Sequence, residues 1–165
     1  MRNASTIRIW HERLAAVGPD GERLPLSSLT PGAHVHGGLR LEIAGRRVPY
    51  MGYWGEDDVC FGQWLEELQH AVDALHLDDG RHVFDEGEQG QPAFVFERSG
   101  SKGCFSIAPS MLSDADGDPD WHRVEFSPPE FFSEFARMRS EFIAEILQEA
   151  PIHGAGWLAR TLGDA

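Results

Sequence analysis

The most regular hydrophobic pattern of the chain predicts an amphipathic helix. From Asp57 to Leu77, apolar residues recur every three or four positions with acidic residues between them, so one helical face is apolar. Asp57 and Asp58 stand at its start, where carboxylates accept hydrogen bonds from the unpaired backbone N–H groups of the first turn. The side chains expected to face the core from this helix are Phe61, Trp64 and Leu68.

A second helix of the same kind is predicted from Ser127 to Ala150. Ser127 is suited to accept the N–H of Glu130, and Pro128 fits the first helical position, where a backbone donor would have no partner. A proline after Ala150 ends this helix, and residues 157–162 form a short last one. The core-facing side chains predicted here are Phe135, Met138 and Phe142.

Short segments with alternating apolar and polar residues, or with many β-branched and aromatic residues, predict strands. Residues 39–43 and 46–50 form a hairpin around Ala44-Gly45, whereas residues 24–38, rich in Pro, Gly, Ser and Thr, are expected to be a loop. An antiparallel meander is the simplest arrangement of the four strands in the middle of the chain. The remaining predicted strands cover residues 5–10, 82–84, 94–96, 103–107 and 122–126.

These elements predict a single α+β domain over residues 1–165. About six to seven strands form one antiparallel sheet on which the two long helices pack, because an apolar helix face needs a second layer to cover it. A length of 165 residues is ordinary for one domain, and a hydrophobic content of 41% is sufficient for a folded core.

Charge is distributed unevenly along the chain. Residues 1–50 hold seven arginines and four acidic residues, a net charge of +3, whereas residues 51–165 hold seven basic and twenty-three acidic residues, a net charge of −16. Such an acidic field repels nucleic acid and anionic lipid and attracts basic proteins. No apolar segment approaches the ~20 residues that span a bilayer, and the first ten residues lack the pattern of a secretion signal. We therefore expect a cytoplasmic protein with a basic protein partner, and neither nucleic-acid nor membrane binding.

One acidic segment has the spacing of a calcium-binding EF-hand loop. The residues at its first, third, fifth and twelfth positions are Asp114, Asp116, Asp118 and Glu125. The sixth position requires a glycine for a sharp turn, but here it is Pro119, whose φ is fixed. We predict a solvated acidic loop that binds no metal.

His34 and His36 would place two imidazoles on one face of a strand, which is the beginning of a zinc or iron site. A third ligand would have to come from a distant histidine such as His82, His122 or His153. In a loop rich in Gly and Pro, two histidines are more often plain surface residues. We assign no metal and no other cofactor.

Neither of the two cysteines stands in a context that activates a nucleophile. Cys60 lies on the first predicted helix and Cys104 in a strand, both among apolar neighbours, which favours buried free thiols over a disulfide in a reducing compartment. The sequence has no Gly-x-Ser-x-Gly segment, and no cysteine is predicted at a helix start. We therefore predict no catalytic residues and no enzyme activity.

Two aromatic residues between glycines precede the first helix. Tyr53 is the better candidate for an exposed binding residue, because tyrosine gives a large contact area at low entropic cost. Trp54 is expected to pack on the helix start as a hydrophobic staple.

Three segments of the chain share a layout and composition with one group of proteins. They are Tyr53–Asp58, Phe61–Leu68 and Val83–Glu88, the last followed by Pro92-Ala93-Phe94. With them, residues 50–126 resemble small uncharacterised bacterial proteins that look like immunity proteins of polymorphic and contact-dependent toxin systems. The resemblance implies a cytosolic inhibitor that blocks the active site of a toxin. It transfers no binding residues, because each immunity protein is shaped to its own toxin.

The sequence thus predicts a protein-binding module, an immunity protein that neutralises a toxin domain by masking its active site. Two other functions stay open: a metal-dependent hydrolase that uses His34, His36 and distant carboxylates, and a structural or adaptor subunit. The residues expected to contact a basic partner are Tyr53, Asp57, Asp58, Asp85, Glu86, Glu88, Asp114, Asp116, Asp118 and Asp120.

Overall fold

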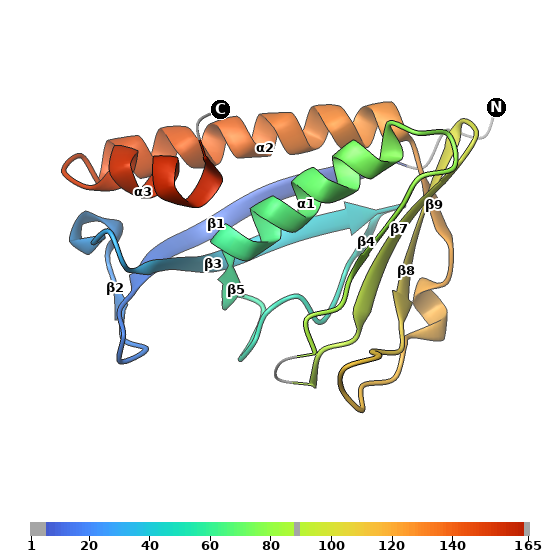
Figure 1. Ribbon diagram of the computed structural model, residues 1–165, viewed down its shortest axis with the longest axis horizontal. Coiled ribbons are helices and arrows are strands. Elements are labelled where there is room, and N and C mark those ends of the chain that lie inside the picture. The colour runs from blue at the N-terminus through green and yellow to red at the C-terminus, as the bar shows by residue number, and fades with distance from the viewer. Residues whose placement is uncertain (1–5, 88–89, 164–165) are drawn as a thin grey trace.

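Two antiparallel sheets carry the helices of the protein, which confirms the predicted α+β class (Figure 1). The computed structural model describes residues 6–87 and 90–163. The first sheet contains β1 (Ile7–Val17), β2 (Arg23–Leu24), β3 (His34–Ile43), β4 (Arg46–Arg47) and β5 (Val59–Cys60). The second sheet contains β6 (Arg81–Phe84), β7 (Ala93–Ser99), β8 (Lys102–Ala108) and β9 (Val124–Phe126). The α-helices are α1 (Phe61–Leu75), α2 (Pro128–Glu149) and α3 (Gly154–Leu162), and short 3-10 helices cover Leu26–Ser28 and Pro119–Trp121.

The long central pair of the first sheet is β1 and β3, in the strand order β2-β1-β3-β4 with β5 added beside β3. A bulge after Glu12 interrupts their pairing, and Arg13 there has a positive φ of 52°. Gly37 lies opposite the bulge, where a Cβ atom would come within 2.8 Å of the Glu12 carbonyl oxygen. The prediction of a loop over residues 24–38 is therefore wrong from His34 onward, because this glycine permits close strand contact rather than a turn.

The predicted hairpin after β3 is present, but its second strand is short. Ala44 and Gly45 both have positive φ and form the turn between β3 and β4. Val48 donates one further hydrogen bond to the carbonyl of Leu41, and Pro49, which has no N–H, follows it. Because the ladder ends there, the later strands pair with one another and form a second sheet instead of extending the single sheet expected.

The second sheet is the antiparallel meander predicted, in the order β6-β7-β8-β9. Its strands β7 and β8 pair from Ala93 with Ala108 to Ser99 with Lys102, around a turn in which Gly100 has a φ of 62°. Figure 1 shows this sheet below the start of α2 and the end of α1.

The first helix begins later than predicted. Cys60 is the residue before the first turn of α1, whereas Asp57 and Asp58 bind side chains of the first sheet and do not cap the helix. The start of α2 agrees with its prediction, because Ser127 accepts the N–H of Glu130 at 3.4 Å. None of the helices in the described ranges is long and apolar enough to cross a membrane.

Aromatic side chains of α2 join both sheets in one core. Near the start of α2, Phe131 stacks on Phe96 of the second sheet with 5.6 Å between ring centres, and near its end Phe142 stacks on Phe61 of α1 at 5.1 Å. The short helix α3 closes this end of the core, and its Trp157 indole N–H donates to a carbonyl just before β3 at 2.9 Å. The six predicted core-facing side chains are all buried: Phe61, Trp64, Leu68, Phe135, Met138 and Phe142.

Phe142→Ala is expected to lower the free energy of unfolding by ~3–5 kcal/mol, because the ring is 0% exposed and its removal leaves a cavity. Chemical denaturation measures the loss. Leu147→Ala, on the exposed side of the same helix, is the control and should change stability by less than about 1 kcal/mol. A similarly small effect for Phe142→Ala would contradict the packing described.

Candidate functional site

Loops that are far apart in the sequence meet at one end of the molecule. They cover residues 50–58, 85–87, 90–92 and 109–118, and we call the surface that they form the loop edge. In Figure 1 it lies at the bottom, on the side of the sheets away from α2 and α3. The residues predicted to bind a partner come almost entirely from these loops.

Hydrogen bonds between the loops fix the loop edge. The Asp85 carboxylate accepts from the Ser110 hydroxyl and from the Met111 N–H, each at 2.7 Å. The Gln91 side-chain amide donates to the Gly52 carbonyl at 3.1 Å. Each loop is thus bound to another loop as well as to its own strand.

The loop edge exposes large apolar side chains. The exposed fraction is 82% for Trp54, 90% for Met111, 69% for Leu112 and 53% for Tyr50. Exposed apolar side chains that gather on one surface are typical of a binding site.

The burial of Tyr53 and of Trp54 differs from what was expected, while partner binding by Tyr53 stays a prediction. Tyr53 is half-buried, and its hydroxyl contacts the side chains of Gln63, at 2.8 Å, and Glu86. Trp54 points to solvent and does not pack on the helix. The turn between the glycines is so tight that a Cβ atom on Gly52 would lie 1.8 Å from the Gly55 carbonyl oxygen.

The acidic residues predicted to bind a partner fall into two groups. Those engaged in hydrogen bonds or ion pairs within the protein are Asp57, Asp58, Asp85, Glu86 and Asp118. Those with exposed side chains are Asp114, Asp116 and Asp120. Glu88 lies outside the described residues.

The segment with EF-hand spacing is built as two structural elements rather than as one calcium loop. Asp118 accepts the N–H of Asp120 at 3.0 Å, and Pro119 begins a 3-10 helix at the expected sixth position. Glu125 lies in β9, where its carboxylate binds Lys102 at 3.0 Å.

A buried arginine fixes the loop before α1 against the first sheet. Arg40 of β3 is 4% exposed, and its Nη2 lies 2.6 Å from the Asp57 carboxylate and 3.3 Å from that of Glu12. Its Nη1 donates to the Glu56 carbonyl at 2.7 Å, and its Nε has no partner among the residues described. A Cβ atom on Gly38 would lie 2.7 Å from the guanidinium, so this glycine gives the arginine room to lie along the strand. The loop cannot leave the sheet without unpairing a buried cation.

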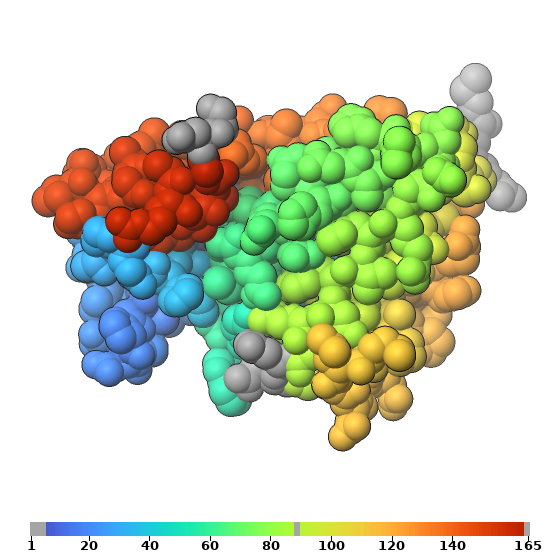
Figure 2. All heavy atoms as spheres, viewed as in Figure 1, coloured from blue at the N-terminus to red at the C-terminus, as the bar shows by residue number. Residues whose placement is uncertain are grey.

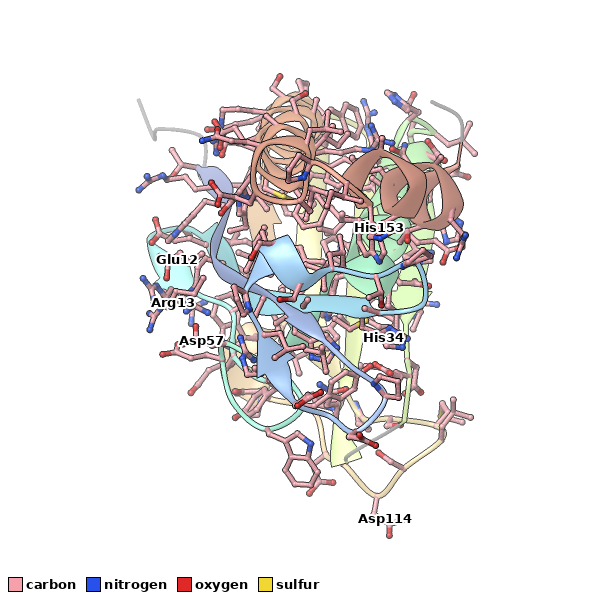
Figure 3. The ribbon with its side chains drawn as sticks, turned by 90° about the vertical axis from the view of Figure 1, so that its left-hand side faces the viewer. Glu12, Arg13, His34, Asp57, Asp114 and His153 are labelled. Carbon is pink, nitrogen blue, oxygen red and sulfur yellow. The ribbon has the colours of Figure 1, made fainter. Side chains whose placement is uncertain are left out.

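These contacts lower the pKa values of two carboxyl groups. The hydrogen bond from Arg40 is the main cause of the lowered pKa of Asp57. The pKa of Glu12 is lowered first by the Trp10 indole N–H and then by the charges of Arg40 and Arg13. Figure 3 shows Glu12, Arg13 and Asp57 close together on one side of the molecule.

A groove of about 650 Å³ opens beside Trp54. In Figure 2 it is the notch on the lower surface between the blue hairpin of β1 and β2 and the green-blue loop before α1. The side chains that line it include His34, His36, Asp58 and Cys60.

Three groups in this groove have the complementary chemistry of a thiol nucleophile, a base and an orienting acid. Pairing of β3 with β5 sets His36 directly opposite Cys60, and the His36 Nδ1 lies 2.7 Å from the Asp58 carboxylate. Cys60 also precedes the first turn of α1, a position near the positive end of the helix dipole. The prediction that no cysteine stands at a helix start is therefore wrong, because it placed the start of α1 too early.

The protonated form of His36 is favoured. Burial by itself lowers the pKa of this imidazole, but its hydrogen bonds with Cys60 and Asp58 outweigh burial, and the net pKa is raised. The His34 ring lies 6.2 Å from that of His36. Within residues 6–87 and 90–163, no third His, Cys, Asp or Glu joins these two histidines in a set of ligand atoms within 4.8 Å.

The chain matches no protein-family model, no curated protein and no solved structure.

Stability should fall in acid because of the carboxyl groups around Arg40. In the folded protein the pKa values of Asp57 and Glu12 lie below their ordinary values of 3.8 and 4.5. The two carboxylates therefore stabilise the fold fully at a pH above these ordinary values, and this stabilisation is lost as the pH falls through the lowered pKa values. Arg40→Met removes the cation and should flatten this loss between about pH 5 and pH 2. Thermal unfolding at several pH values measures it. The exposed Arg47→Met should keep the wild-type slope, and an unchanged slope in Arg40→Met would contradict the account.

Proposed function

We propose that this protein binds and inhibits a basic protein partner, as an immunity protein does when it masks the active site of a bacterial toxin domain. The observation that supports this most directly is the loop edge, which carries both exposed apolar side chains and exposed carboxylates. Protein interfaces commonly combine an apolar centre with a polar rim. Here Trp54, Met111 and Leu112 supply the centre, and Asp114 and Asp116 supply the rim.

The bonds within the loop edge favour binding by lowering its entropic cost. A loop that is already ordered loses less freedom on association than one that must first be ordered. Asp85 and Gln91 bind neighbouring loops, and Asp57 is paired with Arg40. Asp85, Gln91 and Asp57 therefore serve to position the surface, and the exposed carboxylates of Asp114, Asp116 and Asp120 are the ones offered to a partner.

Charge indicates which kind of partner fits. Residues 51–165, which contain all of the loop edge except Tyr50, carry a net charge of −16. An acidic surface accelerates the arrival of a basic protein and repels an acidic one. A toxin domain that acts on nucleic acid has a basic cleft, in which these carboxylates would occupy the places of phosphates. The cytoplasm is the compartment in which such an inhibitor would act.

Charge reversal at Asp114, Asp116 and Asp120 together should slow association with the partner by at least about tenfold at low salt and flatten its salt dependence. The partner is first captured from the native host with the full-length chain, and association rates are then measured between low and physiological ionic strength. Reversal of Glu66, Asp73 and Glu149, which are exposed on α1 and α2, changes the net charge equally and should slow association much less. An acidic partner, or equal effects of the two triple variants, would contradict the proposal.

The inhibitory role is tested in cells with the same captured partner. Production of the partner alone should arrest growth, and production together with this chain should restore it. A partner that is harmless by itself would contradict inhibition of a toxin.

The trio in the groove favours a second candidate function, a thiol-dependent hydrolase or acyltransferase. The Cys60 proton would first pass to His36, the resulting thiolate would attack a carbonyl carbon, and Asp58 would hold the imidazolium in place. His36 would return the proton to the leaving group, and water or another acceptor would then release the acyl group.

Iodoacetamide should alkylate Cys60 at pH 6 at least about tenfold faster than Cys104, because His36 lies opposite Cys60 and is hydrogen-bonded to it, whereas burial raises the pKa of the Cys104 thiol. His36→Gln should remove most of this difference. The control His34→Gln changes a histidine of the same groove and should leave the rate unchanged. Mass spectrometry of each cysteine quantifies the rates, and equal Cys60 rates in the wild type and His36→Gln would rule out activation by His36.

A further inference from the structure

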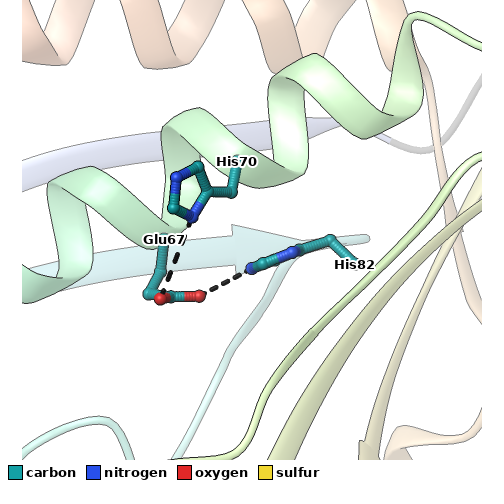
Figure 4. Close-up of side chains that lie close together, drawn as sticks. All are labelled: Glu67, His70 and His82. Atoms are coloured by element: carbon teal, nitrogen blue, oxygen red, sulfur yellow. Dashed lines mark hydrogen bonds and ion pairs between the residues drawn. The ribbon is translucent and has the colours of Figure 1, made fainter.

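Three side chains that commonly bind metals meet on the surface between α1 and β6. Glu67 and His70 lie one helical turn apart and share a face of α1, and His82 comes from β6, which packs beside this helix. Figure 4 shows all three pointing toward one another. One ligand atom from each lies within 4.8 Å of the other two.

The Glu67 carboxylate stands between the two imidazoles. One of its oxygens lies 2.6 Å from His82 Nε2, and the other lies 4.0 Å from His70 Nδ1. The ring centres of the two histidines are 5.7 Å apart. The exposed fraction is 22% for Glu67 and 19% for His82 but 50% for His70, so the cluster is covered on one side and open to solvent on the other.

We propose that Glu67, His70 and His82 form a binding site for a divalent transition-metal ion of the Zn²⁺ class. Two imidazole nitrogens and one carboxylate oxygen suit zinc, which accepts such a set with water in the fourth position. Calcium and magnesium prefer oxygen ligands alone. Zinc holds its ligand atoms at about 2.0–2.2 Å, so the ligand atoms must draw closer together, and the half-exposed His70 side chain is free to make that movement.

A metal ion at this position would connect the helix to the edge strand of the second sheet. The three ligands come together only in the folded chain, so binding stabilises the native state and raises the melting temperature. None of the three residues belongs to the loop edge. The metal site is therefore independent of the proposed partner binding and can be tested without the partner.

The test uses the full-length chain without a histidine tag, stripped of metal by a chelator and titrated with zinc chloride in a calorimeter. The wild type should bind with a dissociation constant of about 50 µM or less, and its melting temperature should rise with zinc. Glu67→Gln and His70→Gln should each weaken binding by at least about tenfold. Magnesium at the same concentration should not raise the melting temperature.

Two control variants distinguish this site from other zinc ligands. Glu66→Gln removes a neighbouring exposed carboxylate of α1 and should bind zinc as the wild type does. Cys60→Ser removes the thiol beside His36 and should also keep wild-type affinity. Wild-type binding weaker than about 50 µM, equal affinity in His70→Gln and the wild type, or loss of binding in Cys60→Ser would overturn the proposal.

Discussion

The position of the candidate site depends on one buried cation. Arg40 lies almost wholly inside the protein, where an unpaired guanidinium would be strongly unfavourable, and its partners are Asp57, Glu12 and the Glu56 carbonyl. Two of these three belong to the loop before α1, so the arginine holds that loop on the first sheet. With Asp57 fixed, the adjacent Asp58 reaches His36.

The pairing of Arg40 with the loop before α1 gives neighbouring side chains of that loop different functions. Asp57 and Asp58 face the sheet and are used to hold the loop, while Trp54, in the same loop, faces solvent. Carboxylates that are already paired contribute order to the surface, and those that are unpaired contribute attraction to a basic partner. The proposed binding surface therefore needs both groups, although, of the predicted acidic residues that the structure describes, only Asp114, Asp116 and Asp120 are exposed.

Much of the fold could be predicted because its signals are local. The Ser127 cap and the proline after it identify the start of α2, and short apolar runs identify β6 to β9. The errors arose where a residue serves a distant partner. Gly37 and Gly38 suggest a loop by composition, but in β3 one admits the bulge of β1 and the other admits the Arg40 side chain.

The candidate site was harder to predict for the same reason. Asp57 and Asp58 match the pattern of a helix start, but their carboxylates bind Arg40 and His36 of the first sheet. Cys60 is therefore the residue before the helix. Only the pairing of β3 with β5 shows that His36 lies opposite this cysteine. For Arg40 the one available signal was Gly38, next to the predicted strand, because a glycine leaves room for a long side chain to lie along a strand.

Hydrogen–deuterium exchange of this protein, alone and bound to its captured partner, tests the central claim most directly. Protection in the complex should be concentrated in the loop edge, while the outer face of α2 exchanges as in the free protein. Protection on the outer faces of α1 and α2, with the loop edge unchanged, would contradict the account.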